Sequence, residues 1–368
     1  MIIQGDVSNL SDVNEVMLFP NTSRQKVYID RLEYFLNNLS IKLIGLKTDE
    51  DGNVIAVFNI SPNDLKIGDV IFISFKVTII QELKKVNISL AHAINSTFNE
   101  IPNDLLRLYT GNTSTWPIPA CIYDLAKSLA ENCSVVMEVL ERFSKWIEDN
   151  IAYPLNQTSR KWIGPQYPLE TYSYKVGDCD DSSILFITMC RAIGLPAFLQ
   201  LGCIPQFDVK WHEVVMHNGN YIHKFKGVGW HAWSMVFIPR LGWMPVDLTY
   251  FSGAKYEPAN FSSAIYIKSY LGVKPKIKYS AYYIANPILY ANFSTLRYVD
   301  NARSWEQAIA GGRLKYMCAE ELSLIKLVNV KEASRVPIPI MVPAVACIAF
   351  FALLITCYFR LKRRQTMQ

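Results

Sequence analysis

Several features that would assign a function directly are absent from this sequence. Its 368 residues contain no Cys-x-x-Cys pair, no glycine-rich phosphate loop, no internal repeat and no low-complexity tract. These absences argue against a zinc module with paired cysteines and against a nucleotide-binding P-loop. Charged residues amount to only 19%, whereas 51% are hydrophobic, which excludes a chain that is disordered throughout.

The net charge of +5, from 37 Lys and Arg against 32 Asp and Glu, is concentrated at the C-terminal end. No acidic residue follows Glu332 and four basic residues follow position 359, so residues 1–336 carry +5 − 4 = +1. A nearly neutral region has no basic stripe for nucleic acid, and we expect no nucleic-acid partner. The four basic residues are Arg360, Lys362, Arg363 and Arg364.

One long apolar segment precedes this basic cluster. Residues 338–359 read IPIMVPAVACIAFFALLITCYF, about 22 residues without a charge, enough to cross a hydrocarbon core of roughly 30 Å as a helix. We therefore predict a membrane-anchored protein with a single transmembrane helix over residues 336–360 and a basic tail over 361–368. The basic tail favours a cytoplasmic C-terminus and a domain outside the cell. The opening MIIQGDVSNL lacks a basic n-region and an apolar h-region, which leaves open an upstream start or a cytosolic tail-anchored protein.

Eleven Asn-x-Ser/Thr triplets favour the outside location and predict a glycoprotein. Chance predicts about two or three in a chain of this composition. In an oxidising compartment Cys121 could pair with Cys133, and Cys203 with Cys318, although spacing does not fix the connectivity. The triplets begin at Asn9, Asn21, Asn38, Asn59, Asn87, Asn95, Asn112, Asn132, Asn156, Asn260 and Asn292.

Residue patterns predict a β-rich N-terminal part followed by a mixed core. Strands are expected over 39–46, 54–60 and 70–80, separated by turn residues, which is typical of a sandwich-like module. Helical spacing predicts helices over 118–130 and 135–151, and a third from 179 to about 193, closed by Gly194 and Pro196. Strands are expected over 230–238 and 243–248. Residues 265–331 receive no assignment.

Three residues in the core have the chemistry of nucleophilic catalysis. Cys179 begins the third helix, where unpaired amides and the helix dipole favour a thiolate. The flanking carboxylates oppose this trend, so a cationic partner is needed, and His231 is the candidate. If the strands around the 239–242 turn pair about Pro239, His231 faces Asp247, with Cβ atoms about 5 Å apart. Asp247 would then orient the imidazole in a Cys–His–Asp arrangement.

The segments that hold these residues resemble the transglutaminase-like superfamily of papain-related thiol enzymes. The resemblance covers about residues 115–250 and rests on GDCDDSSILFITMCRAIGLPAFLQLG, HAWSMVFIP and GWMPVDLT, in the family's order. It implies that Cys179 is the nucleophile, His231 the general base and acid, and Asp247 the orienting residue. It also implies an α+β core, with the cysteine at a central helix start packed on an antiparallel sheet. The sequence departs from the family pattern at two places: Ser182-Ser183 replaces a commoner aromatic-Ala pair, and Leu248 stands where Pro is frequent. Neither departure removes a catalytic group.

We therefore expect a β-rich module over 1–105, a transglutaminase-like core over 106–265 and an extension of uncertain assignment over 266–335. The expected function is thiol-dependent acyl transfer on protein peptide or carboxamide bonds, most simply as a cysteine protease-like hydrolase. Two alternatives stay open: a protein-crosslinking transglutaminase and a non-catalytic cell-surface binding module. The expected partners are a protein or peptide substrate and the membrane.

The remaining candidate residues give weaker patterns, and we expect no cofactor and no metal. The backbone amide of Cys179 is a candidate oxyanion donor, and Trp162 is better explained by packing than as a second donor. The segment His212-Glu213 to His217 has the wrong spacing for a zincin helix. Other conceivable ligands, without a supporting motif, are Cys203, His212, His217 and His223 for zinc, and Asp178, Asp180 and Asp181 for calcium.

Overall fold

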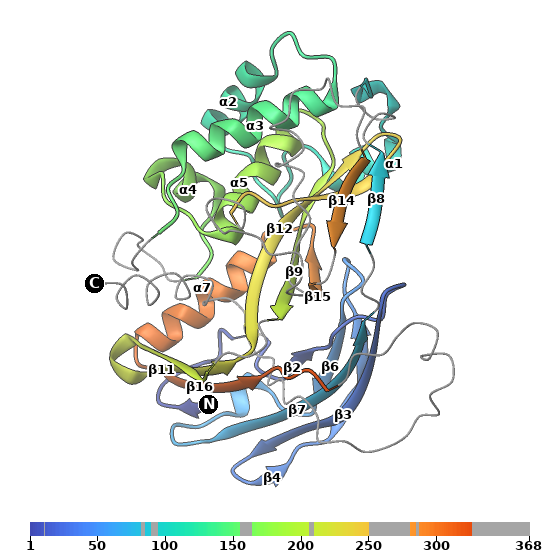
Figure 1. Ribbon diagram of the computed structural model, residues 1–368. Coiled ribbons are helices and arrows are strands. Elements are labelled where there is room, and N and C mark those ends of the chain that lie inside the picture. Colours follow the sequence, from blue (N-terminus) through green and yellow to red (C-terminus); the bar gives the residue numbers. More distant parts are fainter. Residues whose placement is uncertain are drawn as a thin grey trace, which may run out of the picture.

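The computed structural model describes residues 1–10, 12–81, 95–154, 164–205, 210–249 and 287–325, together with the backbone of strands β8 (Lys85–Ser89) and β14 (Ser280–Ile284). Helices gather at one end of the molecule and most strands at the other (Figure 1). No helix within these ranges is long and apolar enough to cross a membrane. The predicted transmembrane helix and the basic tail lie outside the described residues.

The three predicted core helices are present with nearly the predicted bounds. They are α2 (Ala120–Ala130), α3 (Val136–Asn150) and α5 (Cys179–Ala192). All but the last residue of α5 are buried, which makes it the central helix. The ring of Phe143 on α3 meets that of Phe186 on α5 at 6.4 Å between centroids. The described residues contain three further α-helices that were not predicted: α1 (Asn103–Tyr109), α4 (Pro168–Tyr174) and α7 (Arg297–Ala310).

The central helix packs on an antiparallel sheet of four strands. Their order is β13 (Gly242–Val246), β12 (Val228–Ile238), β9 (Ala197–Pro205) and β15 (Ile288–Phe293). The buried hydroxyl of Ser234 on β12 donates to the carbonyl oxygen of Ser183 on α5 at 3.2 Å. A mixed α/β fold with a helix on an antiparallel sheet is therefore confirmed, and β15 comes from the segment that the sequence left unassigned.

A second four-stranded sheet joins the two ends of the described chain. Its order is β1 (Ile2–Ile3), β16 (Leu314–Glu321), β11 (Tyr221–Lys226) and β10 (His212–Met216). Strand β16 pairs antiparallel with β1 and parallel with β11. Sequence proximity could not predict this sheet, because β16 lies about 90 residues beyond β11.

The N-terminal strands form two three-stranded sheets. One holds β2 (Glu15–Met17), β6 (Val54–Phe58) and β5 (Leu43–Thr48), and the other β4 (Leu39–Ser40), β3 (Gln25–Leu36) and β7 (Ile71–Gln81). The rings of Tyr34 and Phe58 lie 4.9 Å apart and link the sheets. The single strand predicted over 39–46 is wrong, because β4 and β5 belong to different sheets. Between β4 and β5 the chain crosses from one sheet to the other.

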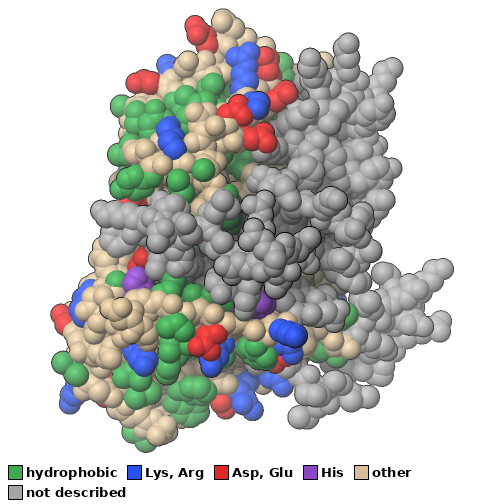
Figure 2. Space-filling model, turned by 60° about the vertical axis from the view of Figure 1, so that its left-hand side comes forward, with side chains coloured by type: hydrophobic (Ala, Val, Ile, Leu, Met, Phe, Trp, Pro, Cys, Tyr) green, Lys and Arg blue, Asp and Glu red, His purple; other side chains and the backbone are tan. Residues whose placement is uncertain are grey.

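These sheets are bound to the C-terminal segment by buried polar contacts. Gln25 donates through Nε2 to the carbonyl oxygen of Leu289 at 2.9 Å, and Asn53 donates to that of Asn292 at 2.7 Å. Buried apolar side chains form one cluster from Ile3 to Leu322. On the face shown in Figure 2, acidic and basic side chains are interspersed rather than gathered in a stripe of one sign.

Neither suggested disulfide is formed, and none of the six cysteines among the described residues is in a disulfide. Cys121 is the second residue of α2, whereas Cys133 lies beyond its C-terminal end. At about 1.5 Å per residue, the helix separates their Cα atoms far beyond the roughly 7 Å that a disulfide tolerates. Cys203 on β9 and Cys318 on β16 lie in different sheets.

Candidate active site

The candidate nucleophile opens the central helix. Cys179 is the first residue of α5 and only 2% exposed. Its backbone N–H therefore belongs to the first turn, where amides have no partner within the helix and the dipole favours negative charge. The carboxylate of Asp181 accepts from the backbone N–H of Asp178 at 3.1 Å, which fixes the residue that precedes the helix.

A buried carboxylate fixes the loop in front of Cys179. Asp181 is fully buried and accepts hydrogen bonds from Gln166, through its backbone N–H at 2.7 Å and its Nε2 at 2.9 Å. The same Nε2 donates to the carbonyl oxygen of Val176 at 2.9 Å. A Cβ on Gly177 would lie 2.7 Å from Cβ of Asp181, so only glycine fits between loop and helix. These contacts hold the start of the helix in one position.

The candidate base and its orienting carboxylate are in direct contact. Nε2 of His231 lies 2.5 Å from Oδ2 of Asp247. The histidine is 7% exposed and the aspartate fully buried. The other carboxylate oxygen, Oδ1, accepts from the backbone N–H of Thr249 at 3.1 Å. Asp247 therefore has one oxygen for the imidazole and one for the chain that follows it.

The predicted strand register is wrong, although the predicted pair is in contact. The structure pairs Ser234 with Val246 and Ile238 with Gly242, so paired numbers sum to 480 rather than 478. The centre of the turn is thus Arg240 rather than Pro239, and Arg240 adopts a positive φ of 69°. Side chains alternate between faces with a period of two, so a shift of two leaves His231 and Asp247 on the same face. The two side chains are in contact diagonally across the strand pair rather than directly opposite each other.

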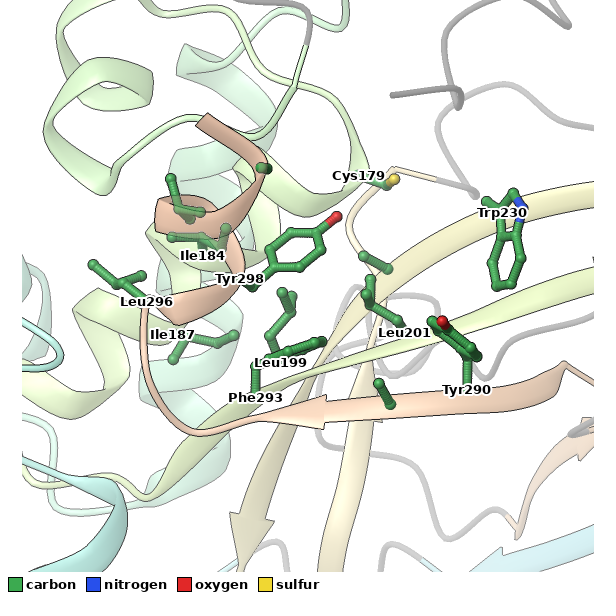
Figure 3. Close-up of a cluster of buried hydrophobic side chains, with 14 of the residues drawn as sticks. Cys179, Ile184, Ile187, Leu199, Leu201, Trp230, Tyr290, Phe293, Leu296 and Tyr298 are labelled. Atoms are coloured by element: carbon green, nitrogen blue, oxygen red, sulfur yellow. The ribbon is translucent and has the colours of Figure 1, made fainter. Parts of the chain in front are cut away.

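The start of α5 and the N-terminal half of β12 lie at the same end of the helix–sheet contact. Figure 3 shows Cys179 and Trp230 at one end of the buried cluster, with Ile184 and Ile187 farther along the helix. Ser183, one turn after Cys179, accepts from Ser234, three residues after His231. Helix and strand therefore bring the thiol-bearing and imidazole-bearing segments to the same end.

An indole packs beside the candidate base. The rings of His231 and Trp233 lie 5.9 Å apart between centroids. Trp233 donates through Nε1 to Oε1 of Gln200 at 3.1 Å, and Gln200 donates through Nε2 to Oδ1 of Asn292 at 2.8 Å. Gly202 is paired with His231 and leaves room for the indole. The imidazole is thus supported by a side chain that three strands hold.

The variant Gly202→Ala is expected to destabilise the protein by about 1–3 kcal/mol, as overpacking of a core does. Its Cβ would lie 2.7 Å from both Cη2 of Trp233 and the carbonyl oxygen of Ile288. Urea unfolding followed by tryptophan fluorescence measures the effect. Gly45→Ala is the matched control, because no atom lies within 4 Å of its added Cβ. Equal unfolding midpoints for the two variants would contradict the packing argument.

A residue from α7, which the sequence analysis did not single out, also reaches the site. The buried hydroxyl of Tyr298 donates to Oδ2 of Asp180 at 2.9 Å. Its ring lies among the apolar side chains beneath the first turn of α5 (Figure 3). Burial, and then the charge of Asp180, raise the pKa of Tyr298 well above its ordinary value, so the hydroxyl keeps its proton. No local pattern signals this contact, because 118 residues separate the partners.

Removing this hydroxyl in Tyr298→Phe is expected to cost about 1–3 kcal/mol of stability, because a buried carboxylate loses a donor. Thermal and urea unfolding of the purified chain measure the loss. Tyr174→Phe removes the hydroxyl of an exposed tyrosine and is the control. An unfolding free energy unchanged within error in Tyr298→Phe would show that Asp180 does not need the bond.

The other candidate residues are only partly brought together. Trp162 lies outside the described residues. Ligating atoms of Asp178, Cys179 and Asp180 lie within 4.8 Å of one another at the candidate nucleophile. A second group of this kind, described below, includes His223 but not His212 or His217.

One protein family and several solved structures are similar to this chain. The family model of the transglutaminase-like superfamily matches residues 123–248. A search of curated proteins found no match. Among solved structures, a proposed cysteine protease from Cytophaga hutchinsonii is 14% identical, with 76% of this chain and 75% of that chain covered and a TM-score of 0.46. Red sea bream transglutaminase is 12% identical, with 66% and 49% covered and a TM-score of 0.30. The periplasmic domain of TgpA from Pseudomonas aeruginosa is 14% identical, with 64% and 71% covered and a TM-score of 0.29.

The family match spans the helix that begins with Cys179 and the strands that present His231 and Asp247. The predicted resemblance is thereby confirmed. Residues 123–248 therefore form a transglutaminase-like domain.

Proposed function

We propose that this protein is a thiol-dependent acyl-transfer enzyme that cleaves peptide or carboxamide bonds of proteins through an acyl-enzyme. The observation that carries the proposal is the buried 2.5 Å contact between Nε2 of His231 and Oδ2 of Asp247, at the end of the sheet where α5 begins with Cys179. The superfamily typically consists of cysteine-dependent enzymes. A buried imidazole fixed by a buried carboxylate is costly to maintain without a chemical role.

The proposed reaction uses the two imidazole nitrogens differently. Because Nε2 donates to Asp247, Nδ1 is left to accept the thiol proton of Cys179. The thiolate attacks the carbonyl carbon, and the backbone N–H of Cys179 stabilises the developing oxyanion. The protonated His231 then gives its proton to the departing amine, leaving a thioester. Asp247 keeps its negative charge throughout and stabilises the imidazolium.

Hydrolysis is the simpler fate of this thioester. Water reaches any open acyl-enzyme, whereas crosslinking needs a second site shaped for a lysine side chain. His231 would take a proton from the attacking water and return it to the sulfur of Cys179. The products are then a free carboxylate and the regenerated thiol.

Mass spectrometry of protein substrates incubated with the full chain tests the proposal. New peptide termini or deamidated glutamines are the expected products, and Cys179→Ala supplies the blank. Lysine–glutamine crosslinks would show that the protein is a transglutaminase rather than a hydrolase. Two results together would favour a non-catalytic surface module. None of the three products would form over a broad substrate panel, and His231→Ala would leave the alkylation rate of Cys179 unchanged.

The proposed location is a membrane, with the catalytic domain outside and the C-terminus in the cytoplasm. Its support is the uncharged segment at 338–359 with four basic residues after it. Cell fractionation of the full chain and of a chain ending at 335 tests the anchor. Only the full chain is expected to resist alkaline extraction of membranes.

Glycan mapping of the native protein tests the outside location. Eight of the eleven triplet asparagines lie among the described residues, and all but Asn292 are exposed. Asn292 is half-buried in β15 and its side chain accepts from Gln200. Exposed sites such as Asn38, Asn59 and Asn95 are expected to carry glycans, whereas Asn292 is expected to remain bare. Unmodified asparagines at every exposed triplet would contradict export through a glycosylating compartment.

A further inference from the structure

A second cluster of ligating side chains lies on the sheet that joins the two ends of the described chain. His223 of β11 is paired with Cys318 of β16 in the parallel register, and Glu320 follows two residues later on the same face. Their exposures are 1%, 6% and 3%. One ligand atom from each lies within 4.8 Å of the other two.

The separations within this cluster are those of metal ligands. Oε1 of Glu320 lies 3.5 Å from Nε2 of His223 and 3.5 Å from Sγ of Cys318. Around a tetrahedral Zn²⁺, with bonds of about 2.0–2.3 Å, the nitrogen–oxygen and sulfur–oxygen edges are about 3.4 and 3.6 Å. The separations of Oε1 from Nε2 and of Oε1 from Sγ therefore already match two edges of a zinc tetrahedron.

The buried imidazole of His223 points independently to a ligand. Neither ring nitrogen makes a hydrogen bond within the part of the chain that the structure describes, although the ring is buried and Oε1 of Glu320 lies 3.5 Å from Nε2. A buried ring nitrogen that makes no hydrogen bond is unfavourable, and a metal bond to Nε2 would offset that cost. The ring is held in place by Phe225, whose ring stacks on it at 5.0 Å.

The carboxylate of Glu320 is oriented by a neighbour of the candidate active site. The indole Nε1 of Trp230 donates to Oε2 of Glu320 at 2.7 Å, which leaves Oε1 directed at His223 and Cys318. Metal-binding carboxylates are commonly held in this way by a second group. Trp230 precedes His231 on β12, so the two side chains leave opposite faces of the strand.

We propose that His223, Cys318 and Glu320 bind one Zn²⁺, with water or a further side chain in the fourth position. A nitrogen, sulfur and oxygen donor set suits zinc and is unsuited to Ca²⁺ or Mg²⁺, which prefer oxygen ligands alone. Binding releases the thiol proton of Cys318 to solvent. The ion ties β11 to β16 and, through Trp230, to the strand that carries His231. It is separate from the proposed catalytic chemistry at Cys179.

The test uses the full chain in detergent, stripped with a chelator and titrated with Co²⁺ as a spectroscopic substitute for zinc. One Co²⁺ per chain is expected, with the visible bands of four-coordinate cobalt and a thiolate charge-transfer band that added Zn²⁺ removes. Cys318→Ser is expected to lose the charge-transfer band. Trp230→Phe keeps an aromatic ring but removes the indole donor, and it is expected to weaken binding about 10–100-fold.

Cys179→Ser is the decisive control, because Asp178, Cys179 and Asp180 form the other group of possible ligands. It is expected to retain the charge-transfer band. A band that persists in Cys318→Ser, or that disappears in Cys179→Ser, would overturn the assignment. Failure of the wild-type chain to bind one Co²⁺ or Zn²⁺ would overturn it as well, so the result does not depend on Cys318→Ser folding.

Discussion

Replacement of Cys179 by alanine is expected to lower turnover by at least about 10⁴-fold, the loss seen when a thiol or hydroxyl nucleophile is removed. The side chains next to Cys179 in the chain are the carboxylates of Asp178 and Asp180, which cannot replace the thiol as the nucleophile. The side chain lost is small, so the fold should persist. Single-turnover assays with the substrate identified by mass spectrometry measure the loss.

Cys121→Ala is the matched control for this experiment. It removes an exposed thiol from α2, whose buried residues are Ile122 and Ala126, and full activity is expected. Circular dichroism should be the same for both variants. Substantial turnover by a correctly folded Cys179→Ala chain would remove the nucleophile from the proposed mechanism.

The second large effect is expected in Asp247→Asn, with a loss of about 10³–10⁴-fold in kcat/KM and little change in KM. The two carboxylate oxygens accept from donors on opposite sides, His231 Nε2 and the Thr249 backbone N–H. An amide has only one oxygen. If that oxygen stays with Thr249, its NH₂ faces Nε2 and forces the proton to Nδ1, where the imidazole can no longer accept the thiol proton. If the amide oxygen stays with His231, the amide NH₂ faces the backbone N–H of Thr249, so two donors oppose each other.

Two measurements separate this tautomer effect from simple destabilisation. NMR of the imidazole nitrogens should show the proton on Nε2 in the wild type and on Nδ1 in Asp247→Asn. Asp30→Asn makes the same change at an exposed carboxylate that accepts a hydrogen bond from Thr78 in β7, and it should leave activity unchanged. Normal kcat/KM in Asp247→Asn would mean that the 2.5 Å contact has no part in the reaction.

The core helices could be predicted from the sequence because their signals are local. Apolar residues at 136, 139, 140, 143 and 147 mark one face of α3, and that face is buried. The start of α5 is marked by the glycine and aspartate before Cys179, and its end by Gly194 with a φ of 82°. The motifs around Cys179, His231 and Asp247 were equally local, so the family could be predicted from them.

The strands were predicted less well because pairing is not local. Strand β3 was missed, since its exposed charged residues and a register shift between Ile29 and Arg31 interrupt the alternation. Strand β16 was missed because its partners are β1 and β11, far away along the chain. The proposed zinc site was not predicted for the same reason, because 95 residues separate His223 from Cys318 and no local ligand spacing marks it.

The sequence by itself determined which residues carry the proposed chemistry, and the tertiary structure decided how they meet. Side chains alternate between the two faces of a sheet, and this alternation alone places His231 and Asp247 on the same face. A register that differs by two residues does not change that result. Only the fold brought Asp181 under the loop before Cys179, Tyr298 to Asp180, and Trp230 to Glu320. Alternation and helical periodicity arise from neighbouring residues, whereas these contacts join residues 15, 118 and 90 positions apart.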